Sequence, residues 1–240
     1  MSDSLDSHLA AYTGGFAYTL DNEIILNWYP ERILELTQSR GSLLELGVGH
    51  GFSSVKFSSQ FSRHVVVDGS RAIIDQFKKN YPACKSQVIE SYFEKFDISE
   101  KFDAMVMGFV LEHVEDPGQI LRRFKKFLVP SGRCFIAVPN AESLHRRVGK
   151  EAGLLGDCMT LGAGDLALGH RRLYTVASLK LELETAGYRL VKTEGLFLKP
   201  FTTEQIESLK LKREILRAMC VVGVEYPELS CALLAEAEPI

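Results

Sequence analysis

Short apolar runs rich in branched residues alternate with stretches of helical spacing along most of this chain. A typical run is HVVVD at 64–68, and the clearest helical spacing lies at 118–128, where apolar residues recur three or four positions apart. Runs that are apolar throughout are typical of parallel strands covered by helices on both faces. The pattern therefore predicts an α/β protein built from β-α units. The expected strands are 43–46, 64–68, 85–90, 102–108, 133–139, 188–195 and 228–237, and the expected helices are 51–60, 71–80, 118–128, 175–186 and 202–219.

Two kinds of segment interrupt this alternation. The stretch 140–170 is rich in glycine and has little periodicity, so we interpret it as an insertion and not as part of the sheet. The PSG at 130–132 predicts the turn that ends the preceding helix. Because no linker is convincing, we expect a single domain over all 240 residues. Its expected parts are an N-terminal lid or helix (1–40), a ligand-binding core (41–139) and two insertions (140–174 and 200–226).

Composition narrows the class of protein only slightly. The hydrophobic fraction is 46%, the charged fraction is 25% and the net charge is −3, so the composition gives no indication of nucleic-acid binding. The basic run RRFKK at 122–126 is better explained as a solvated helix face. Five scattered cysteines without a C-x-x-C pair argue against a disulfide framework or a zinc site. No secretory signal and no spanning apolar run is present. We expect a cytoplasmic monomer or homodimer without a metal and without a membrane or nucleic-acid partner.

The chemistry begins at LGVGHG (46–51), where three alternating glycines follow the first strand. Glycine allows positive φ and a close approach of backbone to a ligand. A nicotinamide-dinucleotide fingerprint would place its third glycine at Phe52 or Ser54, and no phosphate-binding G-x-x-x-x-G-K-[ST] loop is present. Glu45 would also repel a pyrophosphate. An acid suits a cationic ligand such as S-adenosylmethionine, which carries a sulfonium and an ammonium group and no phosphate.

At this point the chain resembles the class I S-adenosylmethionine-dependent methyltransferases, in particular the small-molecule branch of the quinone-biosynthesis type. ELGVGHG (45–51) reproduces their acid followed by Gly-x-Gly-x-Gly. Asp68 in VVVDGS matches the acid that ends their second strand. EKFDAMVMGFVLEHVEDP (100–117) resembles their fourth strand and the loop after it, and FLVPSGRCFIAVPN (127–140) resembles their next helix, turn and strand.

The resemblance covers about 41–140 with its landmarks in order, and 175–240 by pattern only. It implies a Rossmann-like, seven-stranded sheet that is mostly parallel, has an antiparallel last strand and carries helices on both faces. It also implies S-adenosyl-L-methionine as the cofactor.

Roles for single residues follow from the same resemblance. The loop glycines would contact the methionine part of the cofactor, and Asp68 would accept hydrogen bonds from both ribose hydroxyls. Glu45 would act through the loop amides or a water, unless it is only a helix cap or a surface charge. Glu90 would bind the adenine amino group, unless neighbouring Tyr92 and Phe93 are simply core. The expected cofactor-binding residues are Glu45, Gly47, Gly49, Gly51, Asp68, Gly69, Ser70, Glu90, Ser91, Tyr92, Gly108 and Phe109.

A second set of candidates concerns the methyl acceptor. His113 could be a general base or a structural residue. Arg171 and Arg172 could clamp a carboxylate or phosphate of the acceptor. Alternatively they balance the acidic surface, and Tyr174 is simply packed. In the aromatic-rich segment 11–33, Trp28 is better explained by packing. The expected catalytic residues are His113, His170 and Tyr174, and the expected acceptor-binding residues are Tyr12, Tyr18, Arg171 and Arg172.

The predicted reaction is an in-line transfer of the sulfonium methyl group to an oxygen or nitrogen of a small molecule, such as a sugar or other secondary metabolite. Positioning and exclusion of water would supply most of the rate. Two alternatives stay open: an inactive, cofactor-binding partner subunit, and a dinucleotide-dependent oxidoreductase.

Overall fold

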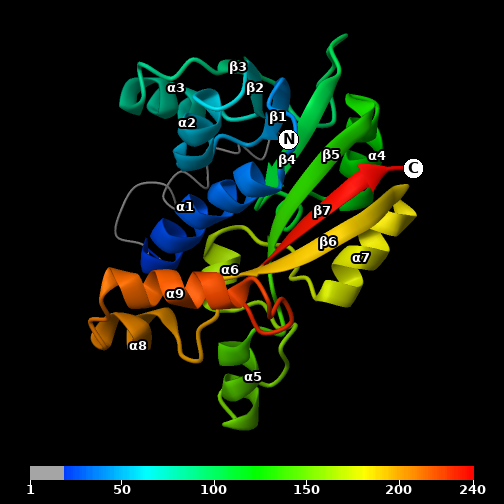
Figure 1. Cartoon of the computed structure of the whole chain (residues 1–240). Coiled ribbons are helices and arrows are strands. Elements are labelled where there is room, and N and C mark those ends of the chain that lie inside the picture. The colour runs from blue at the N-terminus through cyan, green and yellow to red at the C-terminus, as the bar shows by residue number, and fades with distance from the viewer. Residues whose placement is uncertain (1–18) are drawn as a thin grey trace.

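The computed structural model describes residues 19–240 and places a mixed seven-stranded sheet at the centre of the fold (Figure 1). The strand order is β3-β2-β1-β4-β5-β7-β6. Strands β1 to β5 are mutually parallel, and β7 is antiparallel to both of its neighbours, β5 and β6. The predicted fold class is thereby confirmed. The strands are β1 (Ser42–Leu46), β2 (Arg63–Asp68), β3 (Gln87–Glu90), β4 (Phe102–Gly108), β5 (Leu128–Pro139), β6 (Tyr188–Leu196) and β7 (Ala232–Pro239).

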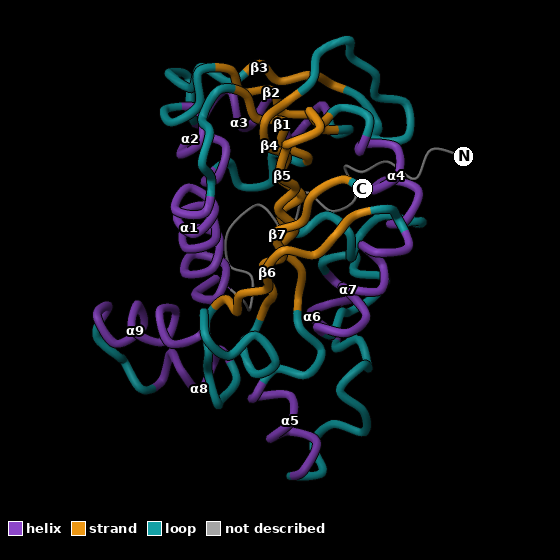
Figure 2. The backbone as a smooth tube through the Cα atoms, turned by 45° about the vertical axis from the view of Figure 1, so that its right-hand side comes forward, coloured by secondary structure: helices purple, strands orange, loops and turns teal. Residues whose placement is uncertain are grey.

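Helices cover both faces of the sheet, and the edge-on view separates α1 and α9 from α4 and α7 (Figure 2). On β1, Leu44 and Leu46 belong to the core cluster that includes α4 and α7, whereas Leu43 packs with α1 and α2. This burial on both sides explains why Leu43, Leu44 and Leu46 are all apolar. The helices are α1 (Thr19–Leu36), α2 (Phe52–Ser58), α3 (Arg71–Asn80), α4 (Pro117–Lys125), α5 (Leu144–Glu151), α6 (Ala163–Ala167), α7 (Val176–Thr185), α8 (Thr203–Ser208) and α9 (Arg213–Gly223).

The prediction that PSG forms the turn after the fourth helix is wrong. Helix α4 ends at Lys125, and β5 already begins at Leu128 and continues through 130–132. The pairing of β5 with β4 shifts register here, because Phe102 pairs with Leu128 but Ala104 pairs with Arg133. The PSG segment is therefore extra chain taken up by an irregularity within the strand.

The long helix expected at 202–219 is also wrong, since the chain forms two separate helices, α8 and α9. Lys210 lies between them with a φ of +47°, a left-handed conformation that an α-helix cannot contain. No glycine or proline marks this break in the sequence. The last strand also begins four residues later than expected, at Ala232 instead of residue 228.

The direction of the strands determines where the loops gather. Strand β6 is parallel to β5, because each is antiparallel to β7. The glycine loop after β1, the loop after β4, the segment 140–174 after β5 and the α8–α9 segment after β6 therefore all leave the same, carboxyl edge of the sheet. In an open α/β sheet, ligands bind at this edge, near the point where the strand order reverses, which here lies between β1 and β4. Among the helices of residues 19–240, none combines the length and apolar character required to cross a membrane.

Candidate active site

The glycine loop adopts the backbone that its sequence demands. Gly47, Gly49 and Gly51 have φ values of +81°, +51° and +83°, a region that residues with a Cβ avoid. The Gly47 amide donates to the Val67 carbonyl at 2.8 Å, which ties the loop to β2. A Cβ at Gly51 would lie 2.6 Å from the Phe77 ring. The loop is therefore tightly packed against α3 at Gly51, where only glycine fits.

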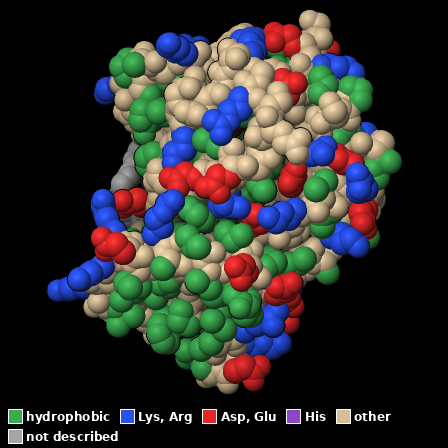
Figure 3. Space-filling view, in the orientation of Figure 1, with side chains coloured by type: hydrophobic (Ala, Val, Ile, Leu, Met, Phe, Trp, Pro, Cys, Tyr) green, Lys and Arg blue, Asp and Glu red, His purple; other side chains and the backbone are tan. Residues whose placement is uncertain are grey.

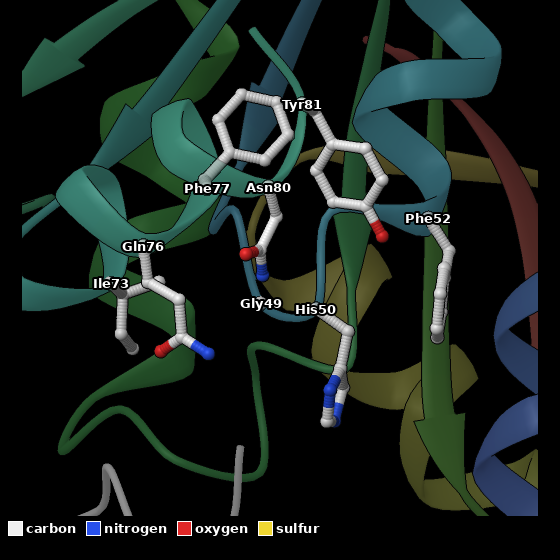
Figure 4. Close-up of a pocket in the computed structure, with 8 residues that line it drawn as sticks. All are labelled: Gly49, His50, Phe52, Ile73, Gln76, Phe77, Asn80 and Tyr81. Carbon is white, nitrogen blue, oxygen red and sulfur yellow. The ribbon is translucent and has the colours of Figure 1, made fainter. Parts of the chain in front are cut away.

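A small cavity opens beside this loop, between α2 and α3 (Figure 4). Figure 4 shows His50 of the loop and Gln76 and Asn80 of α3 lying around it, with the rings of Phe77 and Tyr81 above. Of the expected cofactor-binding residues, only Gly49 is among those that line it. The cavity therefore lies next to the expected cofactor site and does not coincide with it.

Glu45 is fully enclosed and contacts α2 instead of the loop amides. One carboxylate oxygen accepts a hydrogen bond from the Ser53 hydroxyl at 2.5 Å, and the other accepts one from Ser54 at 2.7 Å. The His64 Nε2 atom lies 3.1 Å from the second oxygen, outside hydrogen-bond geometry. Glu45 thus fastens the first turn of α2 to β1, and any influence on a cofactor passes through the position of that helix.

Asp68, at the end of β2, holds the glycine loop directly. Its Oδ2 accepts the Val48 amide at 2.8 Å, and its Oδ1 accepts the Ser70 amide, also at 2.8 Å. Burial raises the pKa of Asp68, although these two backbone hydrogen bonds act in the opposite direction. The carboxylate therefore shapes the loop, and each oxygen keeps a second lone pair with which to accept a ribose hydroxyl.

Glu90 lies beside Asp68, because the two residues are paired in the register of β2 and β3. Its carboxylate is exposed and lies 3.1 Å from the Arg71 guanidinium. The Ser91 amide donates to the Asp68 carbonyl at 2.9 Å. Tyr92 is 43% exposed, so the alternative interpretation of this tyrosine as core does not hold. The structure thus brings the expected ribose and adenine contacts to neighbouring strand ends.

At the end of β4, the backbone is crowded and strained. A Cβ at Gly108 would lie 2.5 Å from the Tyr29 hydroxyl, so only glycine fits against this α1 side chain. Phe109 follows with a φ of +58°, which is uncommon for a residue other than glycine, and its ring packs edge-on against Tyr29 at 5.7 Å between centroids. Strained backbone of this kind concentrates at functional sites.

Two of the three expected catalytic residues come together where the loop after β4 meets the segment that precedes α7. The rings of His113 and His170 lie 4.9 Å apart at 76°. Beside them lies Glu112, a fully buried side chain whose two carboxylate oxygens have no hydrogen-bond partner among residues 19–240. Burial raises the pKa of Glu112 to about 7, although the nearby His170 and Arg172 act to lower it. A carboxylate and two imidazoles therefore form one cluster at the carboxyl edge.

The expected roles of Tyr174 and Arg172 need correction. Tyr174 is buried in the core, and burial raises the pKa of its hydroxyl, which favours the packing interpretation over an exchange of protons with a ligand. The Arg172 guanidinium donates to the carbonyls of Leu111 and Val114, and also to that of Glu115. Both terminal nitrogens of Arg172 thus hold the loop after β4 in shape, which favours a structural role over an acceptor clamp.

The remaining candidates differ in how they are placed. Arg171 is exposed and lies 3.6 Å from the Glu115 carboxylate, so it stays available to a bound molecule. Trp28 is buried in the core with the Arg217 guanidinium 4.7 Å from its ring centroid, which fits a packing role. Tyr12 and Tyr18 lie outside the described residues.

Several residues that shape this site could not be identified from the local sequence. Glu112 belongs to a motif that was recognised, but its burial beside His170 depends on contacts between distant segments. Ser53 and Ser54 look like ordinary first-turn residues of α2, and Tyr29 looks like one aromatic residue among many. A carboxylate that follows the apolar FVL (109–111) is the one local signal that could have singled out Glu112.

A sheet of order 3-2-1-4-5-7-6 with one antiparallel strand, a glycine loop at the reversal point and acids ending β2 and β3 defines a Rossmann-like, class I methyltransferase fold. The family model described as a methyltransferase domain matches residues 23–193, well over half of the chain. This chain therefore belongs to the methyltransferase-domain family. Methyl transfer dependent on S-adenosylmethionine, as expected from the sequence, is the activity of this family, and S-adenosylmethionine is the cofactor.

Relatives and solved structures agree with this assignment. A cypemycin N-terminal methyltransferase from Streptomyces sp is 25% identical over 198 residues, which cover 70% of this chain and 81% of that protein. The N-methyltransferase NodS from Bradyrhizobium japonicum WM9, in complex with S-adenosyl-L-homocysteine, superposes with a TM-score of 0.62 at 14% identity and covers 98% of this chain and 97% of its own. The magnesium protoporphyrin IX methyltransferase from Synechocystis PCC 6803, also with bound S-adenosylhomocysteine, gives 0.63 at 13% identity, covering 98% and 94%.

Proposed function

We propose that this enzyme transfers the methyl group of S-adenosylmethionine to an oxygen or nitrogen atom of a small molecule bound at the carboxyl edge of the sheet. The observation that carries the proposal is the alignment of the glycine loop, Asp68 and Glu90 on neighbouring strand ends. Under this proposal the loop glycines and Gly108 border the methionine part, Asp68 and Ser70 hold the ribose, and Glu90, Ser91 and Tyr92 surround the adenine.

The acceptor would enter between the segments that follow β4, β5 and β6. Helix α8 is fastened to α1, because the buried Lys199 ammonium and the Thr203 hydroxyl both contact the Asp21 carboxylate. Apolar side chains gather on the surface where Figure 1 places α5, α8 and α9 (Figure 3). Exposed residues such as Val221 and Val222 belong to this surface. These features favour an acceptor with an apolar part.

The proposed reaction asks little covalent work of the protein. The acceptor lone pair attacks the methyl carbon, the bond from carbon to sulfur breaks, and S-adenosylhomocysteine leaves as a neutral thioether. A base is needed only for a hydroxyl acceptor, and under this proposal the imidazole of His113 or His170 would accept that proton.

Two measurements test the proposal. Calorimetry should show binding of S-adenosylhomocysteine and no binding of a nicotinamide dinucleotide; the reverse result would refute the cofactor assignment. Incubation with labelled S-adenosylmethionine and a panel of alcohols, phenols, amines and carboxylates should give a product heavier by one CH₂ group. Tight cofactor binding without any turnover would instead favour the inactive partner subunit. A cypemycin-like peptide with a free N-terminus belongs in the panel, given the relative from Streptomyces sp.

A further inference from the structure

The strongest unassigned feature is the cluster of Glu112, His113 and His170. One candidate ligand atom from each side chain lies within 4.8 Å of the other two. Two of these residues follow β4, and the third precedes α7, so the cluster joins segments that are distant in sequence. It lies at the carboxyl edge, directly after Gly108 and Phe109.

Glu112 is the observation that points to a ligand. It is 0% exposed, and neither carboxylate oxygen has a hydrogen-bond partner among the described residues. A buried carboxylate without a partner is costly, so native structures normally satisfy it with a hydrogen bond, a counter-charge or a metal ion. Arg172 lies near enough to influence Glu112, but its guanidinium donates to the backbone carbonyls of the same loop.

We propose that Glu112, His113 and His170 bind a divalent first-row transition-metal ion. Two imidazoles and one carboxylate are a ligand set that suits zinc or iron(II) and leaves open coordination positions. Magnesium and calcium, which prefer oxygen ligands only, fit this set poorly.

The neighbouring residues support this use of His170. Its Nδ1 faces the Asp165 carboxylate at 3.3 Å, and Asp165 is itself held by the Gly162 amide at 2.8 Å. A histidine that ligates a metal commonly has its other ring nitrogen directed at a carboxylate, which fixes the orientation of the ring. Asp165 is therefore a positioning residue in this proposal.

Binding requires a small inward movement. Metal-to-ligand bonds of about 2.0–2.2 Å place neighbouring ligand atoms roughly 3.0–3.5 Å apart. The three side chains must therefore approach one another by roughly 1–2 Å, which rotation of side chains on two loops can provide.

A metal ion at this site would also restrict the class of methyl acceptor, a consequence that rests on the proposed methyl transfer. An oxygen of the acceptor at an open position would lose its proton to solvent more readily, and its lone pair would then form the bond to the methyl carbon while the electrons of the broken bond stay on sulfur. A bound amine would have its lone pair occupied by the ion. The site therefore favours a hydroxyl acceptor that carries a second oxygen donor.

Titration of the full chain, stripped with a chelator, with Zn²⁺ and separately with Mg²⁺ tests the site. We expect one equivalent of Zn²⁺ to bind, with Mg²⁺ at least 100-fold weaker. Glu112→Gln and His170→Ala should each weaken Zn²⁺ binding by at least 100-fold, and Asp165→Asn by roughly 10- to 100-fold. Glu115→Gln is the matched control, because this exposed acid lies on the same loop outside the cluster, and its Zn²⁺ affinity should equal that of the parent.

Binding of S-adenosylhomocysteine in the same samples separates the two proposals. A chain that binds S-adenosylhomocysteine but no Zn²⁺, or whose Zn²⁺ affinity is the same in all the variants, overturns the metal site and leaves the methyl-transfer proposal standing. Circular dichroism of each variant identifies any loss that comes from unfolding, and the nearly isosteric Glu112→Gln then decides.

Discussion

Replacing Asp68 by asparagine separates the two tasks that the structure gives this side chain. The carboxylate accepts the amides of Val48 and Ser70, each at 2.8 Å, in a nearly buried position. Asparagine keeps the shape but offers only one acceptor oxygen, so its NH₂ group must face one of the two amides. One charge-assisted hydrogen bond is then lost, which costs about 1.5–3 kcal/mol.

For a chain of this size, that loss corresponds to a melting temperature lower by about 3–12 °C. If Asp68 also holds the ribose, the affinity for S-adenosylhomocysteine should fall by roughly 10- to 150-fold, equivalent to about 1.5–3 kcal/mol. Differential scanning calorimetry of the ligand-free protein gives the first quantity, and isothermal titration gives the second.

Asp97→Asn is the control, because this exposed aspartate pairs with Lys126 on the surface, far from the glycine loop in sequence, and its replacement should change neither quantity measurably. An unchanged melting temperature for Asp68→Asn would show that the carboxylate does not hold the loop. An unchanged affinity in a folded variant would refute the ribose assignment even if the stability falls.

Three further substitutions test other parts of the structure. Gly51→Ala should lower the free energy of unfolding by about 2–4 kcal/mol, because a positive φ and an overlap with Phe77 act together. Gly153→Ala, where the positive φ lies in open space, should lower the free energy of unfolding by only about 1–2 kcal/mol. Equal losses in urea titrations would contradict the packing argument. Arg172→Lys should lower the free energy of unfolding by about 1–3 kcal/mol and speed proteolysis at 110–115, because an ammonium cannot span three carbonyls. The same change at the exposed Arg171 should do neither. A loop that still resists the protease in Arg172→Lys would argue against the role of Arg172 in holding it. Burial, together with Lys199 and Arg146, lowers the pKa of His145 from 6.5 to about 3, so the unfolded chain binds the extra proton between these values and stability falls as the pH drops through this window. In His145→Gln, the free energy of unfolding should fall by about 1.4 kcal/mol less per pH unit than in the parent protein. Urea titrations from pH 6.5 to pH 4 measure this difference. Parallel pH dependences of the two proteins would refute the assignment to His145.

The cofactor edge could be predicted from the sequence because its signals are local. A glycine at every second position of 47–51, an apolar run on each side and an acid at the end of β2 each depend on a few consecutive residues. The acceptor side depends on contacts between distant segments instead. No local pattern indicates that His170 lies next to Glu112 and His113, or that Arg172 binds backbone carbonyls of the loop after β4 instead of an acceptor.

The break between α8 and α9 escaped prediction for another reason. Lys210 is exposed and adopts a left-handed conformation, although 202–219 contains no glycine or proline that would mark the break. The chain just before α8 is joined to α1 through Lys199 and Asp21. The segment that borders the proposed acceptor entry is therefore positioned by a buried ion pair that the sequence pattern does not reveal.

The two acids of the recognised motifs do different physical work, although both lie next to the glycine loop. Glu45 faces α2 and satisfies both of its oxygens with hydroxyls of that helix, whereas Asp68 faces the loop and satisfies its oxygens with backbone amides. Each acid fixes one side of the loop, so that its positive-φ glycines already have their conformation before a ligand arrives. A loop ordered in advance loses less conformational freedom on binding. The acid before the first glycine is therefore explained by the placement of helix α2, and direct attraction between Glu45 and the cationic cofactor is not required.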